Sequence, residues 1–263
     1  MSLLFVLFSG AIFSQTTISN DTAKKSVFAT NPITTKHKIL VLPFNNKMYM
    51  SEIDHVINAE TKQNQKEIRW GFKDGIDEQL CKKLKSKYDV VSLIEDTVKN
   101  KKEIGMVIAG VNYSYDKVPV QEKYKAPKSD YKQENQVKKG QIADEVNYDA
   151  RFMNAKIRDK ELLTSLNKKY KTDVFVFVNE LDLKAPPMVN GDLAADKNRT
   201  AVIHYTVFNL AGKEINSGTV SVKFPKNANS PDKISSSYIS KAMEEIAARV
   251  DKALNPPSLV TGK

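Results

Sequence analysis

The distribution of apolar and polar positions predicts alternating strands and helices along the chain. Residues 38–44, KILVLPF, form an apolar run that is typical of a central strand covered on both faces. From 65 to 87 apolar residues recur every four positions, which predicts an amphipathic helix. Asn64 and Glu67, at the start of that helix, have the spacing of a capping box. Residues 88–94, YDVVSLI, then predict a second strand.

The second half of the chain continues this pattern. A helix is expected at 159–170, and it leads directly into a strand at 172–183. Strands at 200–210 and 214–224 are separated by Ala-Gly-Lys, a hairpin signal, and a last helix follows Ser230-Pro231. This order of elements predicts an α/β (α+β) fold, with a single mixed β-sheet flanked by helices.

Residues 99–150 lack this regularity. They are rich in lysine, contain five tyrosines and show little periodicity, although 106–115 could hold one strand. We therefore interpret 99–150 as a partly mobile insertion into a single α/β domain that spans 38–254. Gly71 and Gly75 interrupt the long helix before this segment. Each glycine either costs about 1 kcal/mol relative to alanine or permits close packing on the sheet.

The amino-terminal segment predicts export. Residues 1–15 are almost entirely apolar over a length that is too short for a membrane span of about 20 residues but suits a cleaved signal peptide. No lysine or arginine precedes the apolar run, which leaves the true start of the chain open, and a buried strand or helix is the alternative. We interpret 16–36 as a flexible leader and 255–263 as a tail.

Composition narrows the classes of partner. A net charge of +10 would by itself suit nucleic acid, anionic lipid or an acidic polymer. The lysines are spread along the chain, which is typical of a solvated surface, and an exported protein meets little nucleic acid. The single cysteine, Cys81, cannot form an internal disulfide and does not occupy the position of a lipoprotein cysteine, so we expect a small core residue there.

One group of side chains could bind a divalent cation if another element added a ligand: Glu52, Asp54 and His55. Adjacent residues on a helix point apart, however, and Ser51 with Asp54 fits the capping box of a helix at 51–60 without any metal. The chain has no glycine-rich phosphate loop and no nucleophile motif, so we expect no cofactor. We interpret His204, within an apolar strand, as structural or surface-facing.

Two sets of side chains predict a partner-binding surface. The chain leaves the first strand through three adaptable or aromatic residues, Met48, Tyr49 and Met50. The insertion then interleaves lysine with four tyrosines, Tyr113, Tyr115, Tyr124 and Tyr131. Tyrosine supplies stacking area and lysine supplies charge, a combination that suits a sugar polymer, a nucleic acid or a protein. The alternative is a solvated, lysine-rich loop.

Several landmarks together resemble one family. KILVLPF opens the domain, KKYKTD runs directly into VFVFVNELDL, and HYTVFNLAGKEI precedes SGTVSVKF and a long final helix. This order is similar to the envelope α/β domain shared by the amino-terminal domain of TolB, LpoB and CsgG. The matching positions are Val41-Leu42-Pro43-Phe44, Asp173-Val174 and Gly212-Lys213.

The resemblance implies a TolB-N/CsgG-like sandwich that acts as an adaptor, an activator or a secretion component rather than as an enzyme. Two features of this sequence depart from the family. The lipoprotein cysteine of LpoB and CsgG is absent, and residues 99–150 have no counterpart, which argues against a CsgG-like pore.

Three hypotheses follow. The leading one is a non-catalytic exported protein, periplasmic or outer-membrane associated, that binds another envelope protein through 45–64 and 110–150 and has no transmembrane span. The second is a peptidoglycan-binding module that uses the Lys/Tyr-rich insertion, and its binding should weaken steeply with salt. The third is a metal-dependent hydrolase centred on Glu52, Asp54 and His55.

Overall fold

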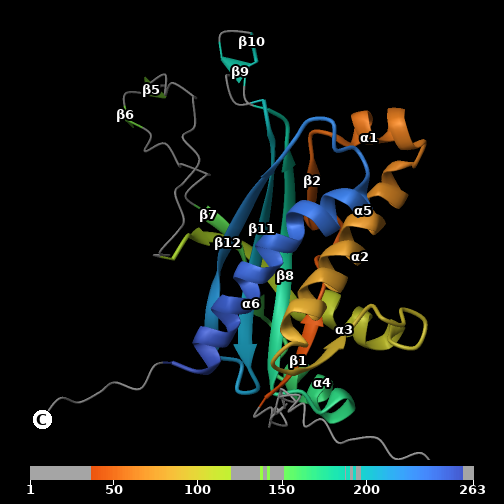
Figure 1. The fold of residues 1–263 in the computed structure, drawn as a ribbon. Helices are drawn as coiled ribbons and strands as arrows, with labels where there is room; N and C mark the ends of the chain where they lie inside the picture. The colour runs from red at the N-terminus through yellow and green to blue at the C-terminus, as the bar shows by residue number, and fades with distance from the viewer. Residues whose placement is uncertain are drawn as a thin grey trace, which may run out of the picture. The chain divides into compact units, whose positions relative to one another are not determined.

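The computed structural model describes three long stretches of the chain and the backbone of four short strands (Figure 1). The long stretches are 37–119, 151–186 and 197–256. The short strands form two small antiparallel pairs, β5 with β6 and β9 with β10. Their bounds are β5 Val137–Lys138, β6 Gln141–Ile142, β9 Met188–Val189 and β10 Asp192–Leu193.

The central sheet is mixed and has the strand order β12–β11–β8–β1–β3. β1 pairs in parallel with both β3 and β8, whereas β11 pairs antiparallel with β8 and β12. A short strand, β2 (Tyr49–Ser51), pairs in parallel with the far end of β8. The bounds are β1 Lys38–Leu42, β3 Asp89–Ser92, β8 Val174–Lys184, β11 Arg199–Asn209 and β12 Glu214–Phe224.

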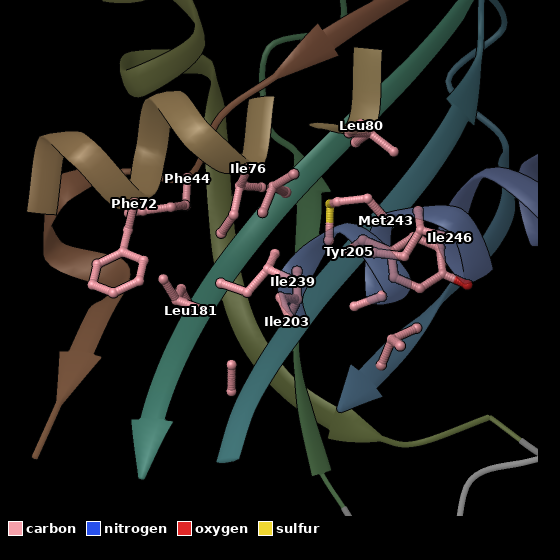
Figure 2. Close-up of a cluster of buried hydrophobic side chains, with 14 of the residues drawn as sticks. Phe44, Phe72, Ile76, Leu80, Leu181, Ile203, Tyr205, Ile239, Met243 and Ile246 are labelled. Atoms are coloured by element: carbon pink, nitrogen blue, oxygen red, sulfur yellow. The ribbon is translucent and has the colours of Figure 1, made fainter. Parts of the chain in front are cut away.

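Helices pack on both faces of this sheet, because successive strand residues point to opposite sides. Ile39 and Val41 of β1 join a core that includes α2 (Gln65–Leu84) and α6 (Ser240–Leu254), drawn in Figure 2. Leu40 and Leu42 join a second core with α3 (Lys101–Gly110) and α4 (Leu162–Tyr170). The predicted α/β class, with one mixed sheet flanked by helices, is confirmed.

A two-stranded antiparallel ribbon accompanies α3 and α4, and the sequence pattern did not reveal it. It consists of β4 (Val111–Lys117) and β7 (Arg151–Ile157). The strand expected at 106–115 is therefore wrong in its first half, where the chain is still in α3. The apolar run GMVIAGV suits either state, and burial of Val107 in the second core, which also contains Leu162 and Leu166, selects the helix.

The chain between β1 and α2 differs from its prediction. It forms a short 3-10 turn, η1 (Asn46–Met48), then β2, and only then α1 (Asp54–Thr61). The capping box expected from Ser51 and Asp54 does not form, because Ser51 belongs to β2 and the Asp54 carboxylate accepts the Tyr49 hydroxyl at 2.6 Å. The second predicted capping box, Asn64 with Glu67, is confirmed at the start of α2.

The glycines of α2 allow contact with another helix rather than with the sheet. α2 meets α5 (Pro231–Ile234) and η3, the π-helical turn Ser235–Ile239 that leads into α6. A Cβ atom at Gly75 would lie 2.6 Å from both Cβ and Oγ of Ser235. Real Cβ atoms essentially never approach another atom so closely, so the helices depend on the missing side chain.

We expect Gly75→Ala to lower the free energy of unfolding by about 1–2 kcal/mol, because overpacking outweighs the gain in helix propensity. Gly105→Ala is the matched control: Gly105 is also helical, but no atom of the described stretches lies within 4 Å of its missing Cβ. That variant should gain up to about 1 kcal/mol. Urea denaturation measures both, and equal effects at the two positions would contradict the close contact.

Candidate functional site

An apolar cleft lies at the carboxyl ends of β1 and β3. The chain passes from β1 through α2, on one face of the sheet, to β3, which lies on one side of β1. It then passes through α3 and α4, on the opposite face, to β8, which lies on the other side of β1. Ligands of open α/β sheets bind where the crossovers change direction in this way. The cleft has a volume of about 260 Å³ and is lined by Pro43, Phe44, Asn45, Asn46, Trp70, Lys73, Leu93, Ile94, Thr97, Ile104, Val107, Ile108 and Tyr113.

Two large apolar side chains in the walls of the cleft are partly exposed to solvent. Trp70, from α2, is 45% exposed, and Ile108, from α3, is 57% exposed. At the end of the strand, Pro43 cannot donate a ladder hydrogen bond, and the Asn45 side chain caps η1 by accepting the Lys47 N–H. The chain therefore turns away from the sheet immediately after β1 and leaves the cleft open between α2 and α3.

Lys73 supplies the charge among the side chains that line this cleft. It is only 8% exposed, its ammonium donates to Asn46 Oδ1, and it lies 5.3 Å from the centre of the Phe44 ring. Burial, together with the nearby Arg69 charge, lowers its pKa to about 8. Within the described stretches, no carboxylate forms an ion pair with Lys73. An almost buried ammonium without an acidic partner is uncommon, because burying a charge is costly unless it is paired.

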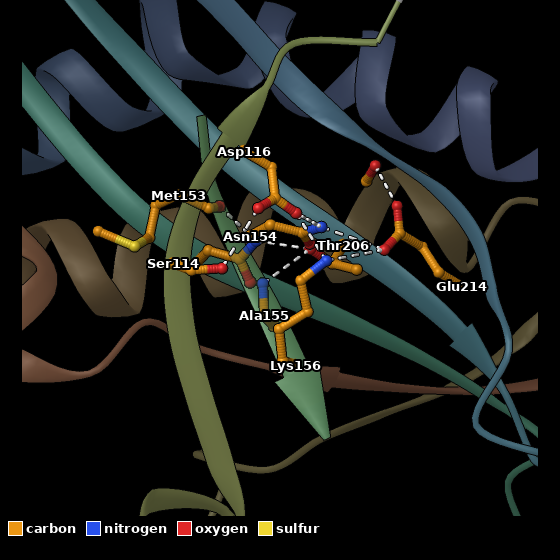
Figure 3. A network of polar contacts seen from close by, with 10 residues as sticks. Ser114, Asp116, Met153, Asn154, Ala155, Lys156, Thr206 and Glu214 are labelled. Atoms are coloured by element: carbon orange, nitrogen blue, oxygen red, sulfur yellow. Dashed lines mark hydrogen bonds and ion pairs between the residues drawn. The ribbon is translucent and has the colours of Figure 1, made fainter. Parts of the chain in front are cut away.

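A second concentration of polar groups lies where β7 crosses the sheet. Thr206 of β11 is completely buried, and its Oγ1 donates to Asn154 Oδ1 at 2.6 Å (Figure 3). The same atom accepts the Ala155 N–H and the Asn179 side-chain amide. These contacts fasten the β4–β7 ribbon onto β8 and β11, so we interpret this network as structural.

Next to that network, Glu180 and Asp182 of β8 lie beside His204 of β11. The His204 ring is 3.5 Å from Glu180 and 3.8 Å from Asp182. The Tyr115 hydroxyl donates to the Glu180 carboxylate and lies 3.2 Å from each of its oxygens. Burial raises the pKa of Glu180 to about 7 and that of Asp182 to about 6, and it lowers the pKa of His204 to about 3. The histidine is therefore neutral.

The hydrogen bonds of His204 limit what this acidic group can bind. The side chains lie close enough together to hold an ion. However, the Met153 N–H donates to His204 Nδ1 at 2.8 Å, so in the neutral ring the proton sits on Nε2. Neither nitrogen then offers a free lone pair, and a cation would find only carboxylate ligands. We therefore assign no metal to this group.

A third buried acid lies between α2 and β3. Asp77 is 6% exposed, and its Oδ2 accepts the hydroxyl of Ser92 at 2.5 Å and the thiol of Cys81 at 3.8 Å. Burial raises the Asp77 pKa to about 7. Cys81 is a buried free cysteine, as expected from the sequence, and burial raises the pKa of its thiol, which makes it a poor nucleophile.

The proposed metal ligands of the first loop have other contacts. Glu52 accepts the Ala185 N–H at 2.8 Å, Asp54 accepts from Tyr49, and His55 is exposed. Among the described residues, the side chains close enough together to hold an ion are instead Glu180, Asp182 and His204, to which we assign no metal. The hydrolase hypothesis thus gains no support from the geometry of this loop.

The predicted partner-binding residues lie in different environments. Met48 and Tyr49 pack against the core, whereas Met50 is 54% exposed. Tyr113 lines the cleft, and Tyr115 is 43% exposed with its hydroxyl on Glu180. Tyr124 and Tyr131 lie outside the described residues, so the peptidoglycan hypothesis stays a prediction.

Sequence reasoning missed the residues that define the acidic group on β8 and those that define the cleft. Glu180 and Asp182 could have been found, because acids within a strand that starts as a continuous apolar run stand out from the pattern. Lys73 gave no comparable signal, since lysines are spread along the chain. Trp70 and Ile108 come from two separate helices, and only folding brings them to one cleft.

Comparison with known proteins provides little further information. No family model matches the chain, and no curated protein matches its sequence. One solved structure found is lipoprotein GNA1162 from Neisseria meningitidis, which is 12% identical and aligns over 83% of this chain and 97% of that chain with a TM-score of 0.35. A TM-score this low supports no argument about function, and the resemblance to TolB, LpoB and CsgG stays a prediction. Within the described stretches, no helix combines the length and the apolar character that crossing a bilayer requires.

Proposed function

We propose that this chain is a non-catalytic, exported protein of the cell envelope that acts as an adaptor by binding another envelope protein. The observation that supports the proposal is the cleft at the carboxyl ends of β1 and β3. Trp70 and Ile108 expose 45% and 57% of their surfaces beside it. Tryptophan and apolar anchors in a pocket are the features that dominate the energetics of protein interfaces.

The amino-terminal sequence supports the location. Residues 1–15 have the apolar character of a signal peptide, and the polar segment that follows is typical of an exported leader. The contact surface that we propose differs in part from the surface expected from sequence. It keeps Tyr113 and adds Trp70 and Ile108, whereas Met48 and Tyr49 contribute to the core instead.

Photo-crosslinking in cells tests the adaptor proposal. A photoreactive residue in place of Ile108 should capture one dominant envelope protein, identified by mass spectrometry, because this position lies on the wall of the cleft. The same residue in place of Leu210, which is 40% exposed in the β11–β12 turn, is the matched control and should not capture it.

A second variant links the capture to the cleft itself. Adding Trp70→Ala to the photoreactive 108 variant should reduce the capture at least severalfold, since removal of an interface tryptophan often costs 2 kcal/mol or more, which is roughly a thirtyfold loss of affinity. Capture of the same proteins from 108 and 210, or an unchanged yield with Trp70→Ala, would contradict the proposal.

A further inference from the structure

The charge of the cleft indicates what enters it. Of the described side chains that line it, Lys73 is the charged one, and these described residues include no aspartate or glutamate. The other charge that affects the pKa of Lys73 is that of Arg69, which is also positive. The cleft is therefore an apolar space with a positive charge at its wall. A ligand that complements both properties combines an apolar body with one negative charge.

The polar contacts at Lys73 leave room for such a charge. Its ammonium has three donors, and the described residues provide one oxygen acceptor, Asn46 Oδ1, together with the face of the Phe44 ring. A carboxylate that reached this nitrogen would complete an ion pair in a partly desolvated place, where such a pair is stronger than at the surface. The Asn45 and Asn46 amides lie in the same wall and could contact a second carboxylate oxygen.

The size of the cleft distinguishes two sources of carboxylate on a protein. About 260 Å³ accommodates one or two apolar side chains and is below the usual size of a small-molecule site. An internal aspartate or glutamate would bring peptide groups from both sides into an apolar space with few hydrogen-bonding partners, which is costly. A carboxyl terminus brings peptide groups from only one side of its carboxylate. Its negative charge also lies next to the last side chain, which can be apolar.

On the basis of the proposed adaptor function, we propose that the cleft binds the carboxyl terminus of a partner protein. The terminal carboxylate pairs with Lys73, and the last apolar side chains pack between Trp70 and Ile108. The partner is thus recognised by an apolar carboxy-terminal segment, a mode of recognition that needs only a short piece of the partner's chain.

Trp70 makes this inference directly measurable, because it is the single tryptophan of the chain and lines the cleft. The titration uses the purified full chain and acetyl-Ala-Leu-Leu-Phe with a free carboxylate, and the readout is the tryptophan fluorescence. The same peptide with an amidated terminus is the matched control. We expect the free acid to bind at least about tenfold more tightly, a difference of about 1.4 kcal/mol.

Variants of Lys73 test whether that difference comes from this ammonium. Lys73→Met keeps an unbranched stem of similar length and should remove the preference for the free acid, while the amide still binds. Lys66→Met, at an exposed position of the same helix, should keep the preference. Circular dichroism and the melting temperature establish that both variants are folded. A preference that persists in folded Lys73→Met overturns the assignment.

Two further probes separate the alternative occupants. Acetyl-Ala-Leu-Glu-Leu-Phe-amide carries an internal acid, and decanoate carries a carboxylate on a lipid-like chain. Equal or tighter binding of either probe overturns the carboxy-terminal assignment, as does the absence of binding by the free-acid peptide at millimolar concentration. If position 108 still captures a partner in cells while free acid and amide bind equally, the adaptor proposal stands and the inference about the carboxylate fails.

Discussion

Thr206→Val should lower the free energy of unfolding by about 3 kcal/mol or more, although valine has nearly the same shape as threonine. Oγ1 of the completely buried Thr206 takes part in three hydrogen bonds, with Asn154, Asn179 and the backbone of Ala155. Valine leaves all three partners without this oxygen, and each buried group that stays unsatisfied costs about 1–3 kcal/mol.

The matched control lies on the neighbouring strand. Thr219 of β12 is 1% exposed, and its Oγ1 has no hydrogen-bond partner among the described residues. Thr219→Val therefore removes a buried polar atom that makes no bond, and stability should stay the same or rise by up to about 1 kcal/mol. Urea denaturation with comparable m values measures both variants. Equal losses at the two positions would mean that β-sheet packing, rather than the hydrogen-bond network, determines the effect.

Asp77→Asn should stabilise the protein at pH 8 by about 2–4 kcal/mol. Burial raises the pKa of Asp77 to about 7 in the folded chain, above the ordinary aspartate value of 3.8 that applies when the chain unfolds. At pH 8 the folded protein must therefore hold an ionised carboxylate in a place that disfavours its charge. Asparagine resembles the neutral acid, and its side-chain oxygen can still accept the Ser92 hydroxyl.

The sign of the pH dependence follows from proton counting. Between pH 4 and pH 7 the folded state holds a proton on Asp77 that the unfolded state has released, so this carboxyl makes stability fall as the pH rises. The advantage of Asp77→Asn should be small near pH 4, grow up to pH 7 and then stay constant. Glu180 and Asp182 contribute in the same direction in the wild type, because burial also raises their pKa values.

Stability measured at pH 4.5, 6 and 8 for wild type and variant checks this prediction. Glu78→Gln is the control, because Glu78 is exposed on the same helix and its replacement should change stability by about 0.5 kcal/mol or less at every pH. A stability difference between Asp77→Asn and wild type that does not change with pH would show that the carboxyl titrates in the same range whether the chain is folded or not.

The two buried polar regions have different roles in these predictions. The network around Thr206 and Asn154 joins β7 to the sheet through hydrogen bonds between neutral groups, so it stabilises the fold. The buried acids instead reduce stability as they ionise. None of the side chains changed in these variants is among the described residues that line the cleft, so the variants test the fold without removing the proposed contacts.

The sequence alone determined the fold class and most of the elements. Continuous apolar runs identified β1 and β8 because strands buried on both faces have no polar side. The capping box of Asn64 and Glu67 located the start of α2, since those side chains satisfy local backbone groups whatever the rest of the chain does. Local signals of this kind are sufficient when the physical cause lies within a few residues.

Only the tertiary structure decided the candidate sites. The helix α3 arose from an apolar run that suited a strand equally well, and contact with α4 selected between the two. Asp54 bonds Tyr49 instead of capping its helix, because β2 places that hydroxyl beside it. The cleft unites Trp70 and Ile108, 38 positions apart, with a lysine that is indistinguishable from the others in sequence. The burial of Lys73 and the exposure of Trp70 and Ile108 give these side chains their properties, and both depend on elements that are distant in the chain.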